Sequence, residues 1–162
     1  IELGTAVAPE LEAYKDEPLA MPQVQVEDGA PLHTLLYVED NPANLKLVEQ
    51  IIARRPDMRL LSATNGIHGI ELARKHQPDV ILMDINLPGM SGIEALQILH
   101  NDPTTKHIPI VALSANATPS DIKKGLHAGF FEYLTKPVKI TEFTDSLNRA
   151  LKFAQENLSR HK

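Results

Sequence analysis

Residues 79–84 read Asp79-Val80-Ile81-Leu82-Met83-Asp84, four consecutive apolar residues between two aspartates. A continuous apolar run of this length is typical of a strand that is covered on both faces in a parallel sheet. Such a strand needs helices on both sides, so this stretch predicts an α/β domain with the strand inside its sheet. Asp84, which ends the run, is then expected at the carboxyl end of the sheet.

Strand and helix patterns alternate on both sides of this run. Further strands are expected at residues 34–38, 59–64, 108–113 and 130–134. Helices are expected after the capping sequences at Asn41-Pro42, Ser91–Glu94 and Thr118-Pro119, over residues 66–76, and around Phe143, Leu147 and Leu151. Five strand–helix units with right-handed crossovers predict a doubly wound, five-stranded parallel sheet.

Composition limits the classes of function. The chain has 162 residues, of which 43% are hydrophobic and 23% charged, as in ordinary globular proteins. It contains no cysteine, which excludes disulfides, thiolate metal sites and cysteine nucleophiles. No apolar run approaches the roughly 18 residues that cross a bilayer.

The net charge of −5 is unevenly distributed. Residues 1–32 carry seven acids, one lysine and four prolines, so we expect an acidic, proline-rich linker there. We expect a domain over residues 33–153 and a tail over residues 154–162. The part after the linker is almost neutral and has no basic stripe, so we expect no nucleic-acid partner.

Polar side chains follow four of the predicted strands. Glu39-Asp40 comes after the first strand, Asp84 ends the third, Ser114 follows the fourth, and Lys136-Pro137 follows the fifth. Each has an ordinary explanation as a helix cap, a turn former or a solvated lysine. The carboxyl ends of parallel strands lie at one edge of the sheet, where α/β folds bind ligands. The joint occurrence of these polar side chains at that edge therefore predicts a ligand-binding or catalytic site.

The residue types of this cluster indicate phosphoryl chemistry. Three neighbouring carboxylates repel one another unless a cation joins them. Oxygen ligands without His or Cys suit Mg²⁺, and a carboxylate near Mg²⁺ can attack phosphorus to give an acyl phosphate. A metal ion and Lys136 together would neutralise the transferring group. We therefore expect bound Mg²⁺ to stabilise the fold.

Four segments, Tyr37–Asn41, Met83–Gly92, Leu113–Ala115 and Tyr133–Pro137, resemble the response-regulator receiver family in order and spacing. The resemblance covers about residues 33–153. It implies a flavodoxin-like (CheY-like) fold with strand order 2-1-3-4-5. It also implies a domain that is no enzyme in its own right, beyond assisting its own phosphorylation and dephosphorylation.

The resemblance assigns the acidic positions. Asp84 is implied to be the phosphoacceptor and a metal ligand. Asp40 is implied to bind Mg²⁺ directly, Glu39 to act mainly through a bound water, and the backbone carbonyl of Asn86 to complete the ligand set. The acidic pair is Glu-Asp here, whereas many members have Asp-Asp, which leaves the part played by the longer Glu39 open.

The resemblance also assigns the remaining positions. Lys136 is implied to contact the phosphoryl oxygens, and Ser114 to shift toward them on activation. Tyr133 matches the aromatic residue whose rotamer is coupled to that shift. The bond between Lys136 and Pro137 resembles one that is cis in the family, although cis is uncommon for X-Pro bonds.

The first residues, Ile1-Glu2-Leu3, resemble the end of a histidine-kinase ATP-binding domain. With the linker and the absence of an initial Met, they favour the C-terminal receiver of a hybrid sensor histidine kinase over a stand-alone response regulator. The implied partner is a kinase dimerisation and phosphotransfer domain or a His-phosphotransfer protein. We expect a cytoplasmic domain without membrane contact of its own, whether or not the parent kinase is membrane-anchored.

Other functions fit the sequence less well. A haloacid-dehalogenase-type phosphatase needs a second Asp two positions after the first, where this chain has Asn86. A flavodoxin-like binding module needs a phosphate-cradling turn where Glu39-Asp40 stands. A Walker-type site is excluded because its glycine-rich motif is absent. A degenerate receiver is disfavoured because every required position is filled.

Overall fold

The computed structural model describes residues 33–115 and 118–160; the predicted linker, residues 1–32, lies outside them. The strands are β1 (His33–Val38), β2 (Met58–Ala63), β3 (Val80–Asp84), β4 (Ile110–Ser114) and β5 (Glu132–Thr135). The helices are α1 (Pro42–Ala53), α2 (Gly66–His76), α3 (Gly92–Asn101), α4 (Pro119–Ala128) and α5 (Ile140–Arg160). All paired strands are parallel, in the order β2-β1-β3-β4-β5. This confirms the predicted fold.

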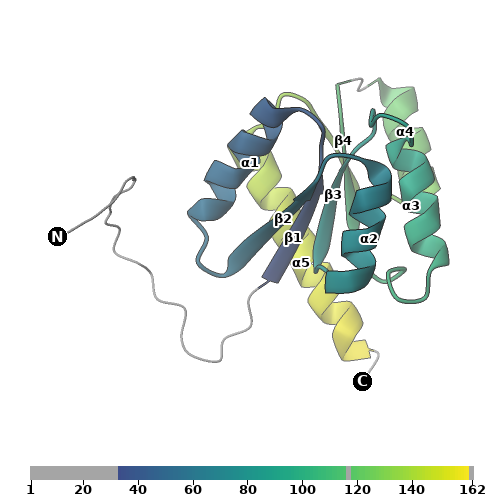
Figure 1. Ribbon diagram of the computed structural model, residues 1–162. Helices are drawn as coiled ribbons and strands as arrows, with labels where there is room; N and C mark the ends of the chain where they lie inside the picture. The colour runs from purple at the N-terminus through teal and green to yellow at the C-terminus, as the bar shows by residue number, and fades with distance from the viewer. Residues whose placement is uncertain (1–32, 116–117, 161–162) are drawn as a thin grey trace. The chain divides into compact units, whose positions relative to one another are not determined.

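Helices cover both faces of the sheet (Figure 1). On one face, Leu35 and Tyr37 of β1 pack in a cluster with residues of α1 and α5. On the other face, Leu36 and Val38 pack in a cluster with residues of α2 and α3. Successive side chains of β1 thus point alternately into two cores, which is why its sequence is apolar throughout.

The strand register brings four chain segments to one edge of the sheet. Val38 at the end of β1 is paired with Met83, next to Asp84. Asp84 is paired with Leu113, so Ser114 extends one residue further. Ser114 in turn is paired with Thr135, which precedes Lys136. The residues after β1, β3, β4 and β5 therefore meet at the carboxyl edge.

The helices that follow this edge begin at capped positions. The Asn41 side chain accepts hydrogen bonds from the backbone N–H groups of Ala43 and Asn44, at 2.8 and 3.3 Å. Ser91 and Glu94 form a reciprocal capping box at the start of α3. These caps stabilise each helix at its first turn and so fix the loops that carry the candidate site.

The last helix is longer than the domain boundary at residue 153 predicts. Residues 154–160, expected as part of a tail, continue α5. Ala154 is 8% exposed and lies one turn beyond Ala150, so it extends the buried face of the helix. Phe153 lies against Phe131, with 5.1 Å between the ring centroids. Within the described residues, no helix is long and apolar enough to cross a bilayer.

Candidate functional site

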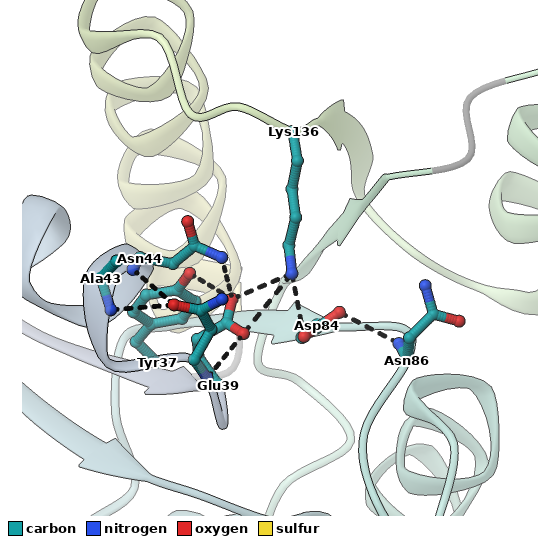
Figure 2. A network of polar contacts seen from close by, with 8 residues as sticks. Tyr37, Glu39, Ala43, Asn44, Asp84, Asn86 and Lys136 are labelled. Atoms are coloured by element: carbon teal, nitrogen blue, oxygen red, sulfur yellow. Dashed lines mark hydrogen bonds and ion pairs between the residues drawn. The ribbon is translucent and has the colours of Figure 1, made fainter.

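The carboxyl edge of the sheet places Lys136 between two acidic side chains (Figure 2). Its Nζ lies 3.1 Å from Oδ2 of Asp84 and 3.3 Å from Oε1 of Glu39. The Asp84 side chain is 2% exposed, and that of Glu39 is fully buried. One partly buried ammonium group therefore faces two buried carboxylates.

Asp84 is held at both oxygens. Oδ1 accepts a hydrogen bond of 3.0 Å from the backbone N–H of Asn86, and Oδ2 accepts one from Lys136. Its backbone is packed just as closely, because a Cβ at Gly92 would lie 2.6 Å from the carbonyl oxygen of Asp84. The third strand and the start of α3 thus position this carboxylate together.

Lys136 is fixed by its own backbone as well. Its N–H donates to the carbonyl oxygen of Ser114 at 2.8 Å, and its peptide bond to Pro137 is cis. Burial lowers the pKa of Lys136, but the hydrogen bond and charge of Asp84, together with Glu39, outweigh it and raise the pKa above its usual value. The lysine is therefore a cation at every physiological pH.

Glu39 has an unfavourable environment for an ionised carboxylate. Burial raises its pKa, the Tyr37 hydroxyl lowers it by hydrogen bonding, and the neighbouring Asp84 raises it again. The net direction is upward. A second cation at this edge would offset both the free-energy cost of burying the Glu39 charge and its repulsion from Asp84.

The acidic residues fit a magnesium site. Carboxylate oxygens of Glu39, Asp40 and Asp84 lie within 4.8 Å of one another. Asp40 is exposed, so it offers a ligand on the solvent side of the two buried acids. An oxygen-only donor set with an excess of negative charge matches the preference of Mg²⁺, which keeps several of its waters in protein sites.

The other predicted residues lie around this group. Ser114 ends β4 and is 2% exposed. Tyr133 is half-buried on β5, and its ring lies against Gly125 of α4, where an added Cβ would come within 2.7 Å of it. Asn86 contributes its N–H to Asp84. The structure thus brings Glu39, Asp40, Asp84 and Lys136 together and places Ser114 and Tyr133 on the adjoining strands.

Sequence reasoning missed two residues that shape this edge. Tyr37 donates a hydrogen bond of 2.7 Å from its hydroxyl to Oε1 of Glu39. The period of two along a strand contained this signal, because residues 37 and 39 share a face. Gly92 was noted only within a longer motif, and its close contact with Asp84 depends on the packing of α3, which spacing alone does not give.

Comparison with known proteins agrees with this geometry. Residues 35–148 match the model of the response regulator receiver domain. The chain is 35% identical over 118 residues to the polar-differentiation response regulator DivK of Brucella anthropi, covering 73% of this chain and 95% of that protein.

Two solved structures extend the comparison. One is the receiver domain of a sensor histidine kinase from Pseudomonas aeruginosa, with a magnesium ion coordinated in the active site cleft. It is 34% identical with a TM-score of 0.68, covering 75% of this chain and 98% of that one. The other is the receiver domain of a signal transduction histidine kinase from Syntrophus aciditrophicus, 25% identical with a TM-score of 0.67, covering 74% and 90%.

Proposed function

The chain belongs to the response regulator receiver domain family, and we propose that its Asp84 accepts a phosphoryl group from a phosphohistidine. The observation that carries this proposal is the group formed by Asp84, Lys136 and Glu39. A carboxylate at the carboxyl end of a central strand lies 3.1 Å from an ammonium group, with further acidic residues beside it. This is the arrangement that a phosphoryl acceptor next to a metal ion requires.

In the proposed step, an oxygen of the Asp84 carboxylate attacks the phosphorus atom. A new P–O bond forms and the P–N bond to the donor imidazole breaks, so the imidazole leaves with the electron pair and takes up a proton. The ammonium group of Lys136 turns from the Asp84 carboxylate to the oxygens of the arriving phosphoryl group. The Asn86 N–H keeps Oδ1 oriented, which leaves the Oδ2 side to react.

We propose that Asp40, Asp84 and the backbone carbonyl of Asn86 bind Mg²⁺, with Glu39 acting mainly through a water. When bound, the ion supplies the positive charge that the phosphoryl oxygens need in addition to Lys136. Ser114 then donates a hydrogen bond to the phosphoryl group. Tyr133, which lies against α4, follows the movement of Ser114 and carries the change to that helix.

The proposal extends to the kind of protein that contains this domain, for which there are two candidates. Similarity to the receiver of a sensor histidine kinase from Pseudomonas aeruginosa supports a receiver within a hybrid kinase. The equally similar DivK, which is matched over 95% of its length, supports a stand-alone regulator as the second candidate. Either setting implies a kinase phosphotransfer domain or a His-phosphotransfer protein as partner, and a cytoplasmic location where ATP supplies the phosphoryl group.

Intact mass after incubation with Mg²⁺ and acetyl phosphate tests the proposed function. We expect one added phosphoryl group that is labile to alkali, and none in the Asp84→Asn variant. A wild-type chain without an adduct, or a variant that keeps it, would contradict the proposal. Omission of Mg²⁺ serves as the control for the proposed metal dependence.

A further inference from the structure

The hydroxyl of Tyr37 lies in the interior of the protein beside a residue of the candidate metal site. Tyr37 is fully buried, and its hydroxyl donates to Oε1 of Glu39 at 2.7 Å, a shorter bond than those from Asn41, Asn44 and Lys136 among the described residues. Glu39 directly follows β1, and its backbone N–H still donates to the carbonyl oxygen of Ala63 at 2.9 Å. Its side chain therefore lies on the same face as that of Tyr37, two residues earlier. Figure 2 shows the Tyr37 ring to the left of the Glu39 carboxylate, on the side away from Asp84.

Glu39 has other partners, but they are weaker or shared. The Asn41 N–H reaches Oε2 at 3.2 Å, and the Asn44 side-chain amide reaches Oε1 at 3.5 Å. Lys136 approaches Glu39 at 3.3 Å while it also bonds to Asp84. Of the side chains that donate to Glu39, Tyr37 alone among the described residues makes a short bond.

This arrangement gives the hydroxyl a specific effect on the carboxylate. Oε1 is drawn toward the ring, so the carboxylate keeps one orientation while Lys136 is free to turn to an arriving group. Without the hydroxyl, the nearest remaining donor to Oε1 is Lys136 at 3.3 Å. Glu39 would then close onto the lysine and strengthen the ion pair with which a bound cation must compete.

We propose that Tyr37 is a positioning residue that orients Glu39 for the metal ion, so that Mg²⁺ affinity depends on its hydroxyl group. This inference rests on the proposed function, because it assumes that the acidic group binds Mg²⁺. Partners in the outer shell of a metal site raise metal affinity by fixing the ligands' orientation. The hydroxyl of Tyr37 bonds to a glutamate two residues later, whose side chain is longer than that of an aspartate and so reaches the hydroxyl.

The test is calorimetric titration with MgCl₂ of the wild type and of Tyr37→Phe, which removes only the hydroxyl. We expect the variant to bind Mg²⁺ about tenfold more weakly. Thr105→Val is the matched control, since Thr105 is fully buried and its hydroxyl donates to the carbonyl oxygen of Leu99 at 2.7 Å, away from the site. It also loses one buried hydroxyl, and its Mg²⁺ affinity should equal that of the wild type.

A double-mutant cycle separates orientation from a general loss of stability. In Glu39→Asp the carboxylate is one methylene shorter and draws back from the hydroxyl. Adding Tyr37→Phe to it should change Mg²⁺ affinity by less than about twofold. An equal loss in both backgrounds would overturn the inference, since it would show that the hydroxyl does not act through Glu39.

The outcomes for the inference and for the proposed function are distinct. A wild type that binds no Mg²⁺ contradicts the proposed site and, with it, the inference. A wild type that binds Mg²⁺ and a Tyr37→Phe variant that binds it equally well overturn the inference alone. Loss of affinity in Thr105→Val as large as in Tyr37→Phe would overturn it too. If Tyr37→Phe unfolds, Glu39→Asp alone must weaken Mg²⁺ binding, and unchanged binding overturns the inference.

Discussion

Both ends of the sheet carry acidic and basic side chains, but Asp79 at the amino end is partly exposed, whereas Glu39 and Asp84 at the carboxyl end are buried. At the amino end, Asp79 accepts a hydrogen bond of 2.7 Å from the Thr34 N–H, and Arg59 donates to the Thr34 hydroxyl at 2.8 Å. The Asp79 side chain is 29% exposed, so water also solvates its charge. At the carboxyl end, the side chains of Glu39 and Asp84 are almost completely buried around one lysine.

This difference separates stability from binding. The charges of the amino end are paired or solvated, so they change the free energy of unfolding only slightly in either direction. The carboxyl end keeps an excess of buried negative charge, which a bound cation would offset. Proteins retain such unfavourable groups where binding needs them. Substitutions at the carboxyl end should therefore change the free energy of unfolding more than those at the amino end. One of them, at Glu39, should raise it.

The largest effect is expected for the lysine that both acids share. Lys136→Met leaves two buried carboxylates without their cation, and we expect a loss of about 3 kcal/mol in the free energy of unfolding without Mg²⁺. Arg59→Met at the amino end should cost less than about 1 kcal/mol. Urea unfolding of both variants measures the difference. Equal losses would show that the carboxyl end is no more strained than the amino end.

A smaller loss is expected from Gly92→Ala. The new methyl group would lie 2.6 Å from the carbonyl oxygen of Asp84 and 2.8 Å from Cα of Ile85, both rigid backbone atoms. We expect a loss of about 2 kcal/mol and slower phosphorylation from acetyl phosphate, because Asp84 is displaced.

Gly66→Ala is the control for this substitution. The three atoms nearest to its methyl group would all belong to the side chain of Met90, with Sδ at 3.0 Å. The cost should stay below about 0.5 kcal/mol because a methionine side chain adapts its shape. Unchanged stability and phosphorylation in Gly92→Ala would show that α3 does not position the acceptor.

Glu39→Gln should change stability in the opposite direction. The pKa of Glu39 is raised, so the folded chain binds this proton more tightly than the unfolded chain does. That contribution to stability is complete below the ordinary pKa of about 4.5 and is lost as the pH rises through the raised value. At neutral pH without metal, we expect the variant to be about 1 kcal/mol more stable.

Urea unfolding of the metal-free proteins as a function of pH checks this prediction. The stability of the wild type should fall relative to Glu39→Gln as the pH rises above the ordinary value for glutamate. Parallel pH profiles, or a less stable variant at neutral pH, would contradict the account of the buried charge. Added MgCl₂ should narrow the difference by stabilising the wild type.

The smallest effect is expected for Asp79→Asn. The amide oxygen can still accept the hydrogen bond from Thr34, and only a partly exposed charge is lost. We expect a change of no more than about 0.5 kcal/mol and unchanged Mg²⁺ affinity. Calorimetric titration and urea unfolding measure both values, and a clear loss of Mg²⁺ affinity would place part of the binding function at the amino end.

The sequence predicted the fold well because both sides of the sheet are covered. Apolar runs placed every strand within two residues of its observed bounds, and capping residues placed the starts of α1, α3 and α4. The last helix was harder to predict. Gln155 and Glu156 interrupt the apolar pattern, so the sequence contains little sign that Ala154 extends the buried face of the helix. The left-handed residue that follows α2 is Gln77, where a glycine would have been a signal.

The site was predictable in its members but not in its contacts. Chain order placed Glu39, Asp84 and Lys136 at one edge, since parallel strands align their carboxyl ends. Which donor holds each carboxylate oxygen depends on rotamers and helix packing. The period of two puts Tyr37 and Glu39 on one face but does not by itself give their hydrogen bond. The bond from Tyr37 to Glu39 and the close approach of Gly92 to Asp84 are both of this kind.

Asp84, rather than its acidic neighbours Glu39 and Asp40, is the proposed acceptor of the phosphoryl group. Borohydride reduction of the chain after treatment with acetyl phosphate and Mg²⁺ converts a phosphorylated aspartate to homoserine, which peptide mass spectrometry locates. We predict homoserine at position 84 and unmodified acids at positions 39 and 40. Reduction at Asp40 or Glu39, or no reduction product in a folded chain that contains Mg²⁺, would contradict the account.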